Sequence, residues 1–300
     1  RSFGLLFSFP FLAIRSFLVG ITHTKALSWA AAIAVLINIP LNFYLIFTRE
    51  LGISGAAIAS SLAEMGSFMM LSFYMWIRLD KEKYGLRPVY NGNLLIKVLK
   101  LSTWSMLHAL ISVAPWFLFF VSIEHLGKIE LAISNITRSV SAIFFVIANS
   151  FALTTGSLVS NAIGAGEGKT LFSICSKILK LGYTIGFPLV AIALLCNRWI
   201  IGFYTSNELL IQLAFAPFVV MLLNYTFALP GYVYLNAVGG TGKTQMTFLF
   251  QVTTTAIYLV YLYWLGRYTQ APLAIYLTAE YVFVILLATQ SIFYLKKKHY

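Results

Sequence analysis

Residues 27–48 read LSWAAAIAVLINIPLNFYLIFT, a run of 22 residues without a charged side chain. An α-helix needs about 20 such residues to cross the roughly 30 Å of hydrocarbon in a bilayer. Pro40 lies inside the run; proline breaks helices in water, but neighbouring helices satisfy the freed backbone groups in a membrane. The run therefore predicts a membrane-spanning helix.

Eight further apolar runs flank this one, and together they predict an all-α membrane protein, a polytopic bundle of about nine transmembrane helices. The predicted spans are 2–19, 27–48, 53–77, 98–123, 130–161, 173–196, 207–237, 245–265 and 271–295.

The composition agrees with a lipid-embedded chain. Hydrophobic residues make up 60% of the sequence and charged residues only 10%, against about 25% charged in soluble domains. The net charge is +12, but the basic residues lie between apolar runs instead of forming a stripe. We therefore interpret them as a topology signal that also attracts anionic lipid head groups, and we expect no nucleic-acid partner.

The basic residues also predict an orientation. One alternating set of connections carries fourteen lysines and arginines and the other set carries four. The positive-inside rule places the richer set, and with it the C-terminus, in the cytoplasm. We expect a multi-pass protein of the plasma (inner) membrane, with a polar cytoplasmic linker over 79–97 between domains 1–78 and 98–300.

Two segments of the sequence resemble one another. Gly20–Lys25 and Gly240–Thr244 each precede an apolar helix, and the following span in each case reaches an acid, Glu64 or Glu280. Such self-similarity predicts a parallel internal repeat. The second half has six spans and the first only three, so the repeat predicts that about 120 residues and three helices precede Arg1.

Enzyme motifs are absent from the sequence: it contains no HExxH, CxxC or GxSxG. Residues 237–244 match a loose phosphate-binding loop, but apolar spans flank them where such a loop needs a strand and an amphipathic helix. We therefore expect a tight turn there, with no catalytic residues, metal site, cofactor or nucleotide.

Ionisable residues within the spans are the first candidates for function. At mid-membrane each costs about 2.5–3.5 kcal/mol on insertion scales, so such groups usually face the bundle interior. Glu64, Glu280, Arg15 and Arg138 lie in or near apolar runs. Two interpretations remain open: a proton or cation relay, or buried ion pairs and carboxylates bonded to a neighbouring helix.

Asn38 and Asn42 are spaced i, i+4, which places both carboxamides on one helical face beside Pro40. They predict either ligands for a monovalent cation or hydronium, or hydrogen bonds between helices.

Span 98–123 contains His108 and an aromatic cluster that includes Trp116. Aromatic rings near a cavity can stack on lipophilic cations, although they can equally face lipid. We assign Arg15, His108, Trp116, Asn135, Arg138 and Asn224 to a candidate substrate cavity.

Several segments resemble the multidrug and toxic compound extrusion (MATE) family, in the right order and spacing over nearly the whole chain. They are Arg15–Gly20 with Thr22 and Thr24-Lys25, Asn38–Asn42, Leu51–Ala59, Ser157–Glu167 and Gly240–Thr244. The resemblance implies twelve helices in two six-helix lobes, of which this fragment would hold the fourth to twelfth.

The resemblance also implies a cation site in the N-terminal lobe, to which Asn38, Asn42 and Ser60 correspond. Position 42 holds Asn where many relatives have Asp. The acids that many relatives carry on the seventh and tenth helices are absent, since the nearest positions hold Ser112 or Val113 and Ala228. Coupling would then use the N-terminal lobe alone, or Glu64 or Glu280.

The family implied by the resemblance consists of antiporters. We therefore predict a monomeric secondary active antiporter that exports organic cations or other xenobiotics in exchange for H⁺ or Na⁺ by alternating access. The alternative is a lipid-linked oligosaccharide flippase of the related superfamily, whose cavity would gather several Arg or Lys side chains around pyrophosphate. A receptor or scaffold is disfavoured, because a binding platform needs no internal repeat.

Overall fold

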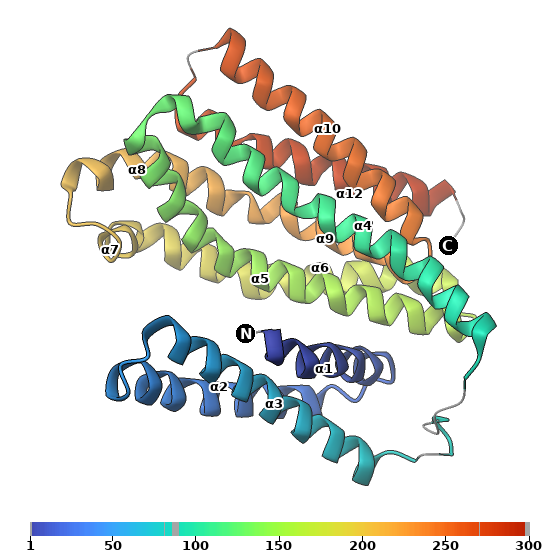
Figure 1. The fold of residues 1–300 in the computed structure, drawn as a ribbon. Helices are drawn as coiled ribbons and strands as arrows, with labels where there is room; N and C mark the ends of the chain where they lie inside the picture. Colours follow the sequence, from blue (N-terminus) through green and yellow to red (C-terminus); the bar gives the residue numbers. More distant parts are fainter. Residues whose placement is uncertain (1, 81, 86–89, 270, 298–300) are drawn as a thin grey trace. The chain divides into compact units, whose positions relative to one another are not determined.

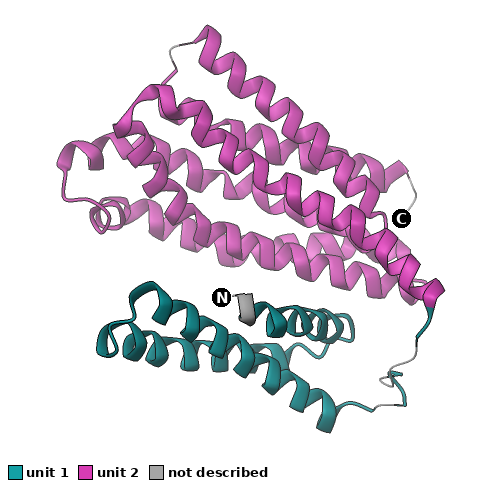
Figure 2. Cartoon of the chain, in the orientation of Figure 1, with its two compact units in different colours: residues 1–91 teal, residues 92–300 magenta. Residues whose placement is uncertain are grey.

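The computed structural model describes residues 2–80, 82–85, 90–269 and 271–297, and this part of the chain consists of helices joined by turns and short connections, with no β-strand (Figure 1). It divides into two compact units, Arg1–Asn91 and Gly92–Tyr300 (Figure 2). The predicted linker begins in the first unit, but its residues from Gly92 onward already belong to a helix of the second. The predicted lobe assignment stays a prediction.

The first unit packs three helices around a small core. They are α1 (Ser2–Gly20), α2 (Lys25–Phe43), which continues as the π-helix Tyr44–Thr48, and α3 (Gly52–Arg78). Ser67 Oγ on α3 donates a hydrogen bond of 3.1 Å to the carbonyl oxygen of Ala30 on α2. This bond and the buried cluster around Leu18 and Leu71 hold α1 and α2 against α3.

The second unit contains the remaining helices. They are α4 (Gly92–Ile123), α5 (Lys128–Gly164), α6 (Leu171–Leu195), α7 (Asn197–Gly202), α8 (Glu208–Leu223), α9 (Tyr225–Gly240), α10 (Thr244–Tyr268), α11 (Leu273–Leu277) and α12 (Ala279–Lys297). Helix α9 lies at the centre and packs against α5, α6, α8, α10 and α12. Glycine permits this close packing: a Cβ on Gly231 would come within 2.7 Å of the carbonyl oxygen of Val284 on α12.

Eight helices in the described part of the chain are long and apolar enough to cross a membrane. They coincide with eight of the nine predicted spans, because α8–α9 and α11–α12 each form one span that is bent at Asn224 or Thr278. The first predicted span corresponds to α1, whose apolar part Gly4–Gly20 is shorter than the other eight.

The outer surface of both units is apolar, as in Ile53, Val260 and Phe293. A lipid-facing helix can expose such side chains because hydrocarbon solvates them. Several polar residues are instead buried inside the second unit, among them Arg138, Gln251 and Thr254. This distribution is the reverse of a water-soluble bundle and confirms the predicted membrane fold class.

Candidate functional site: a charge pair beside an aromatic cavity

The second unit holds a buried ion pair between α5 and α12. Arg138 Nη2 lies 2.6 Å from Glu280 Oε1, and only 8% and 16% of the two side chains are exposed. The Arg138 guanidinium also stacks on Phe119, with Cζ 4.2 Å from the ring centroid. A lone charge at this depth would be costly, so each residue compensates the other.

Tyr258 on α10 is the third member of this cluster. Its Oη lies 3.3 Å from Glu280 Oε1 and 3.4 Å from the carbonyl oxygen of Pro115 on α4. The hydroxyl can donate to one of these acceptors at a time. Glu280 therefore receives donors from two other helices on the same carboxylate oxygen.

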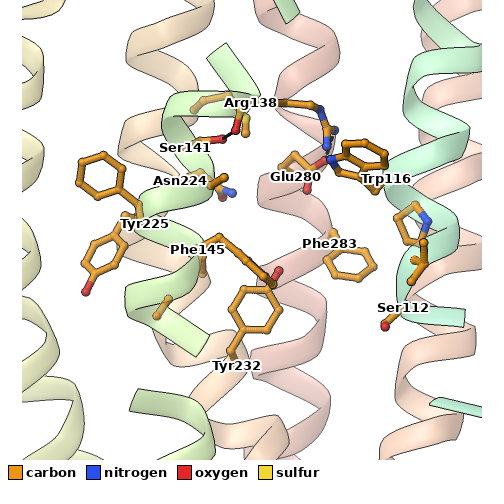
Figure 3. A pocket seen from close by; sticks show the side chains of 17 residues that line it. Ser112, Trp116, Arg138, Ser141, Phe145, Asn224, Tyr225, Tyr232, Glu280 and Phe283 are labelled. Atoms are coloured by element: carbon orange, nitrogen blue, oxygen red, sulfur yellow. Dashed lines mark hydrogen bonds and ion pairs between the residues drawn. The ribbon is translucent and has the colours of Figure 1, made fainter. Parts of the chain in front are cut away.

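A cavity of about 390 Å³ opens beside the pair (Figure 3). Its walls come from α4, α5, α8, α9 and α12, all within the second unit. The aromatic lining consists of Trp116, Phe144, Phe145, Tyr225, Tyr232 and Phe283, and the polar lining of Ser112, Ser141, Asn224, Arg138 and Glu280. Its volume lies in the range of pockets that hold drug-sized molecules.

The fold brings together four of the predicted site residues. Trp116, Arg138, Asn224 and Glu280 all line the cavity, although they come from distant parts of the sequence. Asn224 lies at the bend between α8 and α9, and its Oδ1 is buried with no hydrogen-bond partner in the described part of the chain. Figure 3 shows its side chain between the walls formed by α5 and α12.

The other residues assigned to the cavity lie elsewhere. Asn135 is exposed on α5, and Arg15 is exposed on α1 in the first unit. His108 lies on α4, two turns before Pro115, and its Nε2 is buried with no partner among the described residues. None of the three belongs to the cavity lining.

The candidate ion residues of the first unit lie on two helices. On α2, Asn42 Nδ2 donates to Asn38 Oδ1 over 2.8 Å, as expected for a shared face, and Asn42 Oδ1 is buried without a partner in the described chain. On α3, Ser60 Oγ donates to the carbonyl oxygen of Ala56 over 2.9 Å, and Glu64 Oε2 accepts from Ser8 Oγ over 2.5 Å.

Sequence reasoning missed Tyr258 and much of the cavity lining, including Tyr232, Tyr225 and Phe283. A tyrosine within an apolar run carries little information, because tyrosine is common in membrane helices. The polar residues that precede Tyr258 on α10 at helical spacing were the available signal. Residues 237–244 form the end of α9, a turn with Gly242 at φ +78°, and the start of α10. The described residues contain no cluster of three or more His, Cys, Asp or Glu side chains that would hold a metal ion.

Comparison with known proteins gives a consistent result. The family model MatE matches residues 105–265, which is more than half of the chain. The probable multidrug resistance protein NorM of Photorhabdus laumondii is 25% identical over 211 residues, which cover 68% of this chain and 46% of that protein. The multidrug resistance protein NorM of Aliivibrio fischeri is 22% identical over 89% of this chain and 60% of its own length.

The fold has solved counterparts as well. A crystal structure of MATE in the straight conformation superposes with a TM-score of 0.80 at 15% identity, over 90% of this chain and 62% of that one. The chain thus spans roughly half to three-fifths of the length of these proteins.

Proposed function

Since this chain belongs to the MatE family of membrane transporters, we propose that it works in a secondary active antiporter that exports organic cations or other xenobiotics in exchange for H⁺ or Na⁺. The observation that carries the proposal is a drug-sized aromatic cavity with one compensated charge pair in its wall. Ring faces attract lipophilic cations, and the cavity carries no net formal charge while Glu280 is ionised.

Glu280 gives this cavity a means of coupling. When a proton neutralises Glu280, the positive charge of Arg138 is no longer compensated. Two unit charges about 6 Å apart at an effective dielectric constant of about 20 interact by about 3 kcal/mol, or about a hundredfold in affinity. A bound organic cation and a proton on Glu280 therefore disfavour one another, which is what antiport requires.

The first unit supports a second coupling position. Asn38 and Asn42 present amide oxygens beside Pro40, and Glu64 supplies a carboxylate on α3. Oxygen ligands of this kind suit a monovalent cation or a hydronium. In this proposal the two units are parts of two lobes that open the substrate path to one side of the membrane at a time, with the C-terminus in the cytoplasm and the protein acting as a monomer.

The charge of the cavity also bears on the flippase alternative. A site for a pyrophosphate-linked lipid would gather several arginines or lysines. Among the residues that line this cavity, Arg138 is the single cation, and Glu280 already pairs with it. The lining therefore supports an organic cation over a pyrophosphate.

The proposal is tested with the full-length protein in vesicles loaded with a fluorescent organic cation. An inward H⁺ or Na⁺ gradient should drive efflux of the dye, and dissipating the gradient with an ionophore should abolish it. If neither gradient drives efflux of any of a set of lipophilic cations, the antiport proposal is wrong.

A further inference from the structure

The buried face of α10 changes character at Tyr258. Beyond Tyr258 it consists of Leu262 and Leu265, and before it every buried residue of the helix is polar. These polar residues are spaced i, i+4, i+7, i+8 and i+11 along one face: Thr247, Gln251, Thr254, Thr255 and Tyr258. We call them the α10 polar face.

The opposite side of α10 is mostly apolar, and Thr253 is an exposed polar residue on it. Leu249, Ile257 and Val260 are exposed, as expected of side chains that face lipid. The polar groups are therefore turned away from lipid into the second unit, where Gln251 is 2% exposed and Thr254 is fully buried. Packing alone would be served as well by alanine and valine, which carry no desolvation cost.

The polar groups of the α10 polar face form only some of the hydrogen bonds that they could make. Thr247 Oγ1 donates to the carbonyl oxygen of Thr244 over 2.7 Å, and Thr254 Oγ1 accepts from Gln290 Nε2 on α12 over 3.4 Å. Thr255 Oγ1 is buried with no partner in the described part of the chain. An unpaired hydroxyl inside a membrane protein is costly and calls for a functional explanation.

Helix α4 adds a titratable group at the same depth. It runs parallel to α10: Thr244 Oγ1 lies 3.3 Å from the carbonyl oxygen of Leu101, and Tyr258 Oη lies 3.4 Å from that of Pro115. The offset is 143 residues at both places, which puts His108 at the level of Gln251. The His108 Nε2 atom is the buried one without a described partner.

The geometry points to a proton path along the α10 polar face, between Glu280 and the end of α10 at Lys243. The inference rests on the proposed antiport. Tyr258 joins the face to Glu280, and the eleven residue steps from Thr247 to Tyr258 correspond to about 16 Å of helix. The positive-inside rule predicts that the Lys243 end is cytoplasmic.

Neighbouring members of the face lie one turn apart, with about 5–6 Å between Cβ atoms. A single water molecule spans such a gap between two hydroxyl or amide groups. In each step an oxygen accepts a proton and releases one to the next group. One complete transfer removes a proton from protonated Glu280, which becomes a carboxylate paired with Arg138, and releases one proton at the Lys243 end.

The charged and titratable groups that face this path come from four helices. They are His108 on α4, at the level of Gln251; Glu280 on α12, which Tyr258 contacts; Arg138 on α5, which pairs with Glu280; and Tyr294 on α12, which packs on Phe250 of α10, while Tyr232 on α9 lines the cavity side. Glu280 thus lines the cavity and also contacts the α10 polar face through Tyr258.

Two substitutions interrupt the path without touching the cavity: Gln251→Leu and Thr255→Val. The matched controls are Gln245→Leu, at an exposed position of the same helix, and Thr289→Val, at an exposed position of α12. The full-length protein is reconstituted in vesicles with a lumenal pH dye. Substrate-driven proton movement is recorded beside substrate exchange at equal pH, which needs no net proton transfer.

We expect Q251L and T255V to slow proton movement at least tenfold while substrate exchange stays within twofold of wild type, and we expect both controls to match wild type. Proton movement at the wild-type rate in both variants would overturn the inference, as would a loss of exchange equal to the loss of proton movement. A wild-type protein driven by Na⁺ with no proton movement would also overturn it, yet would leave the antiport proposal intact.

Discussion

Tyr258 Oη lies 3.3 Å from Glu280 Oε1, at the position on α10 where the buried face changes from hydroxyl and amide groups to leucine. Glu280 therefore lies between the aromatic cavity and the α10 polar face. On one side Arg138 and the aromatic cavity hold it, and on the other a polar helix face leads away from it. The predictions below test the pair, the cavity, the packing that forms its wall, and the candidate ion ligands of the first unit.

Removing one partner of the ion pair should destabilise the protein. Arg138→Met leaves Glu280 as a buried charge without compensation, which costs about 3–5 kcal/mol, whereas the double variant Arg138→Met, Glu280→Leu should recover most of that loss. The measurement is thermal unfolding in detergent. Arg198→Met is the control, because the Arg198–Glu208 pair is largely exposed and should contribute about 0.5 kcal/mol or less. Additive single and double effects would contradict a coupled pair.

Trp116 should contribute to cation binding through its ring face. Trp116→Leu removes the indole from the cavity wall and should lower the affinity for an aromatic organic cation by about 1 kcal/mol, about fivefold. Trp116→Phe should retain part of the affinity. Trp199→Leu on α7, which contributes no residue to the cavity lining, should leave affinity unchanged in the same fluorescence titration. Equal affinities for all three variants would show that the ring does not bind the cation.

Gly186 should tolerate no side chain. A Cβ at this position would overlap the ring of Tyr225, which lines the cavity and donates a hydrogen bond of 2.9 Å to the carbonyl oxygen of Gly182. Gly186→Ala should therefore cost about 1–3 kcal/mol and displace the tyrosine. Thermal unfolding checks the cost, with Gly202→Ala, which has open space around it, as the control. A neutral Gly186→Ala would contradict this packing.

Asn42 should matter for the coupling ion more than for stability. Asn42→Ala removes the donor to Asn38 Oδ1, and a side-chain pair at i, i+4 on one helix contributes about 0.2–0.5 kcal/mol. If the amide oxygens bind the ion, the ion concentration for half-maximal efflux should rise several-fold while cation binding in the second unit is unchanged. An unchanged ion dependence would assign the pair a structural role.

The membrane-spanning helices could be predicted from the sequence because every segment that crosses the hydrocarbon must satisfy its backbone polar groups internally. Only helices and closed barrels satisfy backbone polar groups in hydrocarbon, and an uncharged run as long as 27–48 fits a helix and exceeds a barrel strand of about 10 residues. The bends at Asn224 and Thr278 were not predicted. Both residues keep nearly helical backbone angles, so neither resembles a helix terminus in the sequence.

The candidate site was predictable only residue by residue. Arg138 and Glu280 were identifiable because a charge within an apolar run is rare, but they are 142 residues apart and their pairing depends on how α5 and α12 pack around α9. Asn135 and His108 were assigned to the cavity because they are polar residues within predicted spans. The sequence does not show which side of a helix faces the cavity, and neither residue lines it.

The most direct test measures how pH changes the binding of a fluorescent organic cation to the full-length wild-type protein and to Glu280→Gln. We expect wild-type affinity to fall as the pH is lowered, because protonated Glu280 leaves Arg138 uncompensated. The glutamine variant should bind about a hundredfold more weakly at high pH and should respond little to pH. Wild-type affinity in Glu280→Gln, or an unchanged pH dependence, would contradict mutual exclusion of proton and cation at this site.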